Sequence, residues 1–81
     1  MRLTKEVRQN ILRENEGYKE KRLFKGKNYQ QEDTYMIHNQ RLLITTRARI
    51  IYSNKEIKKR RYADEIKTKK FIKKYLNRLK I

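Results

Sequence analysis

Side chains alternate between two sides of the chain over residues 41–53, and this pattern constrains the fold more than any other. One side is mostly apolar and carries Leu42, Ile44, Thr46, Ala48, Ile50 and Tyr52. The other side carries Leu43, Thr45, Arg47, Arg49, Ile51 and Ser53. A period of two with many β-branched residues is typical of a half-buried β-strand. The pattern therefore predicts a sheet whose apolar face is covered by another layer.

Shorter strand signals precede this stretch. Residues 34–37 have a strand-like composition, and a tight turn is expected at His38-Asn39-Gln40 because asparagine tolerates the left-handed backbone conformation. Residues 21–24 and 28–30 flank Gly26, which indicates an opening strand or hairpin. Together these signals predict a small antiparallel sheet of about three strands.

The N-terminal segment has the spacing of a short helix. Leu3, Val7 and Ile11 recur every four residues and form one narrow apolar stripe. Thr4 is the expected N-cap, since its hydroxyl accepts a hydrogen bond from an otherwise unpaired backbone N–H. Gly17 is expected to follow the helix because glycine adopts a positive φ at little cost. The helix is therefore predicted over residues 4–16.

The segment from Ser53 to Ile81 is predicted to be a long basic helix. Its first residues, Ser53-Asn54-Lys55-Glu56, have the spacing of a capping box. Its last part presents a broad apolar face made of Phe71, Ile72, Tyr75, Leu76 and Leu79. The upstream stripe of Tyr62, Ala63 and Ile66 lies about half a turn out of phase with that face. The helix is therefore expected to bend or break near Lys67, and a last strand over residues 57–61 is the alternative.

The predicted fold class is α+β, in a single small basic domain over residues 1–81. The chain has no Pro, two Gly and eight Tyr or Phe, which favours folding even though only 36% of its residues are apolar. It contains no run of about 18 apolar residues and no apolar signal-peptide segment after its N-terminus. Residues 68–80 also have the amphipathic pattern of a membrane-surface helix, but packing on the sheet accounts for the same pattern.

Charge identifies the class of partner. The 81 residues carry a net charge of +15, and residues 41–81 account for +12 of it. Cations that neutralise phosphates release condensed counterions, so this half of the chain is expected to bind nucleic acid or a nucleoprotein. The candidate binding residues are Arg47, Arg49, Lys58, Lys59, Arg60, Arg61, Lys67, Lys69, Lys70, Lys73 and Lys74. They are expected to form one surface, and Tyr35 and Tyr62 are candidates for stacking on unpaired bases.

Groups for catalysis are scarce. The chain has no Cys and one histidine, His38, so no thiolate zinc site, other metal site or cofactor is expected. Carboxylates are adjacent at Glu32-Asp33 and at Asp64-Glu65, without a third ligand at a defined spacing. Helix-turn-helix, zinc-finger and ribbon-helix-helix patterns are not found, and no family resemblance reaches a quotable motif. The chain is therefore not expected to be an enzyme.

Three functions fit these observations, in a fixed order of preference. The first is a non-enzymatic nucleic-acid-binding protein of a phage or other mobile element, since the residue usage is typical of AT-rich coding. The alternative is a small inhibitor of a host nucleic-acid enzyme, of the anti-CRISPR type, that binds a ribonucleoprotein or an acidic host protein. The third is a metal-free, ribosome-dependent RNase toxin, by analogy of size and plan. A cytoplasmic location in a bacterial or phage-infected cell is expected, and the protein is either a monomer or a homodimer.

Overall fold

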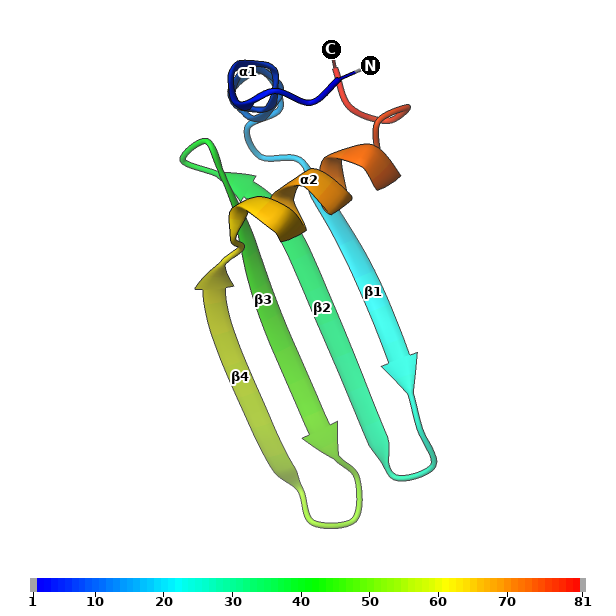
Figure 1. Cartoon of the computed structure of the whole chain (residues 1–81). Coiled ribbons are helices and arrows are strands. Elements are labelled where there is room, and N and C mark those ends of the chain that lie inside the picture. The colour runs from blue at the N-terminus through cyan, green and yellow to red at the C-terminus, as the bar shows by residue number, and fades with distance from the viewer. Residues whose placement is uncertain (1, 81) are drawn as a thin grey trace.

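The computed structural model describes residues 2–80 and consists of two helices and one four-stranded sheet. The elements are α1 (Lys5–Glu14), β1 (Lys19–Lys25), β2 (Tyr29–His38), β3 (Arg41–Ile50), β4 (Lys55–Tyr62) and α2 (Glu65–Lys74). The strands are antiparallel and lie in the order β1-β2-β3-β4. Both helices gather at one end of the sheet, and the other end projects as bare strands (Figure 1). The molecule is therefore elongated, with extents of 46 × 21 × 19 Å.

Helix α1 begins where the sequence predicts. The Thr4 hydroxyl accepts a hydrogen bond from the Val7 amide at 3.3 Å, which confirms Thr4 as the N-cap. Gly17 follows with a φ of +87°, and its amide donates to the Ile37 carbonyl at 2.8 Å. The Asn15 side chain at the end of α1 bonds to both the carbonyl and the amide of Lys80. These bonds fasten the C-terminal segment to the end of α1.

The core lies between the helices and the adjoining half of the sheet. Ile37, Leu42 and Ile72 are fully buried, one each from β2, β3 and α2. Phe71 of α2 lies among the rings of Tyr18, Tyr35 and Tyr75, at centroid distances of 6.3, 5.7 and 4.9 Å. The predicted apolar side of β3 is therefore confirmed at the end where α2 covers it. No helix in residues 2–80 has the length and apolar character needed to cross a bilayer.

The predicted three-stranded sheet and long basic C-terminal helix are wrong. Residues 55–62 form β4, which pairs with β3 from Lys55 opposite Ile50 to Tyr62 opposite Leu43. The expected capping box lies instead around the β3–β4 turn, where Asn54 has a φ of +53°. Helix α2 begins only after Asp64, which caps it by accepting from the Lys67 amide at 2.8 Å. The alternative of a last strand over residues 57–61 is confirmed, and it explains the phase difference as a change from strand to helix.

The pairing of backbone groups explains why β4 forms. Without β4, the amides and carbonyls of β3 that face away from β2 would lack partners beside a packed core. Strand β3 also ends at Ile50 rather than at Ser53, so Tyr52, which the alternation places on the apolar side, lies in the turn. Its side chain is 77% exposed. The strand and hairpin signals around His38 and Gly26 are confirmed as β2, β3 and β1.

Glu16 fastens the β2–β3 turn to the end of α1. Asn39 and Gln40 both have positive φ, and their amides donate to the Glu16 carboxylate at 2.6 and 3.1 Å. The hydrogen bonds from Asn39 and then Gln40 hold the pKa of Glu16 below its ordinary value. The stabilisation from Glu16 is therefore complete above the pKa that this carboxyl has in the unfolded chain. It is lost as pH falls through the lowered pKa of the folded protein.

We expect Glu16→Gln to lower the melting temperature at pH 7 and to have almost no effect at about pH 2. The reason is that a protonated glutamate, like glutamine, no longer offers a charged acceptor to the two turn amides. Thermal unfolding followed by circular dichroism between pH 7 and 2 measures the difference between the two proteins. A difference that stays constant over this range would contradict the role of the charge.

Candidate nucleic-acid interface

The sheet has a helix-side face, which α2 partly covers, and an open face on the opposite side. Tyr35 of β2, which stacks on Phe71 of α2, is paired with Ile44 of β3. Side chains alternate along each strand, so Arg47 and Arg49 of β3 project from the open face. The structure therefore places α2 and these two arginines on opposite sides of the sheet. The single basic surface expected from the sequence is not formed.

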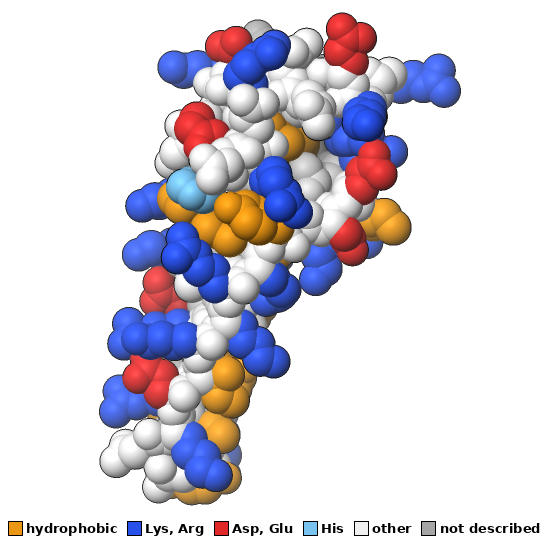
Figure 2. Space-filling view, turned by 90° about the vertical axis from the view of Figure 1, so that its left-hand side faces the viewer, with side chains coloured by type: hydrophobic (Ala, Val, Ile, Leu, Met, Phe, Trp, Pro, Cys, Tyr) orange, Lys and Arg blue, Asp and Glu red, His pale blue; other side chains and the backbone are white. Residues whose placement is uncertain are grey.

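The open face is a flat surface rich in cations. By register it carries Lys19, Lys21, Lys25, Arg41, Arg47, Arg49, Lys58 and Arg60. Its two carboxylates are Glu32, which pairs with Lys21 at 3.6 Å, and Glu56, which pairs with Arg47. In Figure 2, which looks onto the β4 edge, blue side chains flank both sides of the projecting strands. The open face therefore has a surplus of six positive charges.

The Arg47–Glu56 pair fixes two of the charges on this face. The hydrogen bond from Arg47 lowers the pKa of Glu56, and the same bond raises the pKa of Arg47. Both groups are therefore ionised at neutral pH. Arg49 and Lys58 flank the pair and make no ion pair with a carboxylate among residues 2–80. They remain available to an external anion.

Tyr62 lies at the helix end of the open face, beneath a guanidinium group. The Arg41 guanidinium carbon is 4.1 Å from the centroid of the Tyr62 ring, a cation–π contact. A base would meet the guanidinium of Arg41 before it met the ring of Tyr62. Tyr35 is half-buried, and its ring stacks on Phe71. One side of each predicted stacking residue is thus already occupied, and their role in base binding stays a prediction.

A groove between α2 and the sheet forms a second cationic surface, on the helix-side face. It has a volume of about 200 Å³, and its apolar floor is made of Tyr35, Leu42, Ile44, Phe71 and Tyr75. Five cations surround this floor: Arg22 of β1, Arg61 of β4, and Lys67, Lys70 and Lys74 of α2. None of the five makes an ion pair with a carboxylate among residues 2–80. We call this site the cationic groove.

The remaining predicted residues lie apart from one another. Lys59 follows the helix-side face of β4, next to the cationic groove. Lys69 and Lys73 lie on the other side of α2, in a hollow shared with Arg8 and Glu65, which form an ion pair. The sequence thus identifies four of the five groove cations but not Arg22, because the N-terminal half has little net charge. Only the pairing of β1 with β2 brings Arg22 to the groove.

The groups that suggested catalysis do not come together. Glu32 and Asp33 project from opposite faces of β2, because neighbouring residues of a strand alternate. Asp64 caps α2, and Glu65 pairs with Arg8. Residues 2–80 contain no cluster of three or more His, Asp or Glu side chains that would hold a metal ion.

The sheet therefore carries one flat and one grooved cationic surface, and β4 contributes residues to both. Lys58 and Arg60 of β4 face one way, and Lys59 and Arg61 face the other. Comparisons with protein-family models, with curated proteins and with solved structures found no match to this chain.

Proposed function

We propose that this protein is a non-enzymatic nucleic-acid-binding protein of a phage or other mobile element, and that its open face binds the phosphate backbone. The observation that carries the proposal is the charge of that face: eight cations and two carboxylates, both already in ion pairs. Neutralising phosphates with these cations releases counterions, which provides affinity without reading the base sequence. The arginines add two-pronged hydrogen bonding to phosphate oxygens.

The arrangement of the cations supports binding rather than a protective role alone. Lysines on edge strands discourage sheets from pairing with one another, and β1 and β4 are edge strands. Protection of the edges does not explain Arg47 and Arg49, which lie on the inner strand β3. Residues of one strand that share a face are about 6.6 Å apart, so each strand presents a regular row of charges to an extended polyanion. An ordered row of this kind suits a charged backbone.

A salt titration tests this function. We expect a fluorescein-labelled 20-base-pair DNA duplex to bind, with an affinity that falls linearly with salt on logarithmic axes. Five phosphate contacts give a slope of about −4.5. Fluorescence anisotropy between 50 and 300 mM NaCl measures this slope, and labelled polyglutamate of equal length is the control for a general polyanion. The proposal fails if neither DNA nor RNA binds at 50 mM NaCl, or if polyglutamate binds equally well.

A second candidate function, the inhibitor of a host nucleic-acid enzyme, is favoured by the tip of the β3–β4 hairpin. Ile51 and Tyr52 are both exposed at this tip, at the projecting end of the molecule. Exposed apolar side chains on a projecting turn suit insertion into a pocket of a protein partner. We expect a nuclease-treated bacterial lysate to yield a nucleic-acid enzyme bound to the wild type but not to the Ile51→Ser/Tyr52→Ser variant. The same proteins on both would contradict this candidate.

A further inference from the structure

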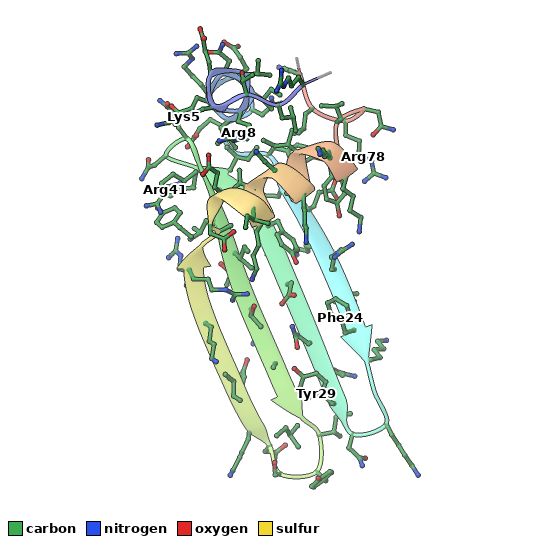
Figure 3. All side chains as sticks on the ribbon, in the orientation of Figure 1. Lys5, Arg8, Phe24, Tyr29, Arg41 and Arg78 are labelled. Atoms are coloured by element: carbon green, nitrogen blue, oxygen red, sulfur yellow. The ribbon has the colours of Figure 1, made fainter. Side chains whose placement is uncertain are left out.

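The part of the helix-side face that α2 leaves bare presents two exposed aromatic rings. Phe24 of β1 and Tyr29 of β2 are 46% and 38% exposed. Phe24 is paired with Gln31, two residues from Tyr29, so the two rings are diagonal neighbours on one face. Figure 3 shows both near the free end of the sheet, on adjacent strands. No element formed by residues 2–80 covers them.

Tyr29 is held in place by hydrogen bonds along its own strand. Its hydroxyl donates to the Gln31 side chain, and the Gln31 amide donates to Asp33 at 2.9 Å. All three residues project from the helix-side face of β2. Because the ring is oriented before any ligand arrives, little conformational entropy remains to be lost on binding. This is how a stacking platform differs from a mobile surface tyrosine.

The rings and the cationic groove lie along one continuous face. Moving up β1 from Phe24, the next residue on this face is Arg22, which lines the groove. On β4, Ile57 is followed by Lys59 and then by Arg61. Each step covers about 6.6 Å, so the aromatic end and the groove are about 13 Å apart. A short extended chain spans both.

The carboxylates on this face do not cancel its charge. Glu20 pairs with Arg78 at 3.0 Å, and Asp33 is buried and accepts from Gln31. Asp33 stands opposite Arg22 in the register but forms no ion pair with it. The groove therefore keeps five cations for a ligand, beside aromatic rings that have no apolar cover.

We propose that the helix-side face binds single-stranded nucleic acid, with unpaired bases stacked on Phe24 and Tyr29 and the backbone running into the cationic groove. Stacking platforms combined with basic grooves are how proteins bind single strands without sequence preference. A duplex hides the faces of its bases and gains nothing from the two rings. This inference rests on the proposed function but uses the opposite face of the sheet, so each can fail separately.

Anisotropy of fluorescein-labelled dT10 and of a 20-base-pair duplex at 100 mM NaCl tests this site. We expect Phe24→Leu/Tyr29→Leu to weaken dT10 binding about 10- to 100-fold, since both stacking contacts are lost. Duplex binding should change less than twofold. Leucine keeps an apolar side chain at both positions, and unchanged circular dichroism verifies the fold. Tyr52→Leu is the matched control, because Tyr52 is exposed but lies in the β3–β4 turn.

The groove has its own variant. Lys67→Gln/Lys70→Gln/Lys74→Gln should reduce the salt slope for dT10 by about 2, at roughly 0.7 for each lost phosphate contact. The inference is overturned if Phe24→Leu/Tyr29→Leu binds dT10 like the wild type, or if this variant and Tyr52→Leu lose the same affinity. It is also overturned if dT10 and duplex binding fall together. In the first two cases duplex binding through the open face still supports the proposed function, whereas failure of every oligonucleotide would refute both.

Discussion

Phe71→Ala is expected to abolish the cooperative thermal transition at 37 °C, because it removes the ring around which the core is built. Three tyrosine rings contact Phe71, and its side chain is almost completely buried between α2 and the sheet. Truncating such a residue costs about 3–5 kcal/mol of unfolding free energy. A single core in a chain of this length supplies about the same amount. The variant should therefore be largely unfolded.

Ile66→Ala is the matched control for this substitution. Ile66 lies in the same helix, α2, but is 66% exposed, so its truncation should change the unfolding free energy by less than about 0.5 kcal/mol. Urea denaturation followed by far-ultraviolet circular dichroism measures both variants. Equal effects of the two substitutions would show that α2 does not depend on the Phe71 cluster for its place on the sheet.

Removing four open-face cations is expected to weaken duplex binding about 10²- to 10³-fold at 100 mM NaCl. The variant carries Gln at Arg47, Arg49, Lys58 and Arg60, two cations from each of the strands β3 and β4. Loss of four phosphate contacts should reduce the salt slope by roughly 3.6. The loss of Arg47 also leaves the Glu56 carboxylate without its partner, which adds repulsion toward phosphate. The fold should persist, because fewer like charges repel one another.

A second fourfold variant separates the position of the charges from their number. Gln at Arg2, Lys5, Arg13 and Lys80 removes the same charge from exposed sites outside the open face and outside the cationic groove. Anisotropy with the 20-base-pair duplex should show less than a tenfold loss for this protein. If both fourfold variants lose the same affinity, net charge alone accounts for binding and the open face is not the interface.

The elements that the sequence predicts correctly are those whose signal is local. Thr4 caps α1 with its own side chain, and Asn39 adopts the backbone conformation that the tight turn requires. The alternation in β3 is legible because α2 covers one of its faces, so Leu42 and Ile44 had to be apolar. In each case the deciding interaction is made within a few residues or leaves a periodic trace.

Strand β4 has no such trace. Cations lie on both of its faces, at Lys58 and Arg60 on one and at Lys59 and Arg61 on the other, so its side chains do not alternate between apolar and polar. All eight of its residues are exposed. What makes it a strand is the row of backbone groups that β3 offers, and that row exists only after the β2–β3 hairpin has formed. A helix is the natural prediction when pairing is invisible.

The division of the basic residues depends on the same fact. Lys58, Lys59, Arg60 and Arg61 form one cluster in the sequence, but a strand sends alternate side chains to opposite faces. A helix would have kept them closer to the lysines of α2. The platform of Phe24 and Tyr29 went unpredicted because nothing near Gly26 indicates which side chains another layer will cover.

The sequence by itself determined the α+β class, the helix start, the central hairpin, and a polyanionic partner class through its +15 charge. The tertiary structure alone decided which cations act together and which aromatic rings stay exposed. The physical reason is one of length. Helix α2 has 10 residues and is about 15 Å long, whereas the 10-residue strands β2 and β3 extend about 33 Å. A helix this short covers one end of the sheet and leaves the rest of both faces to a partner.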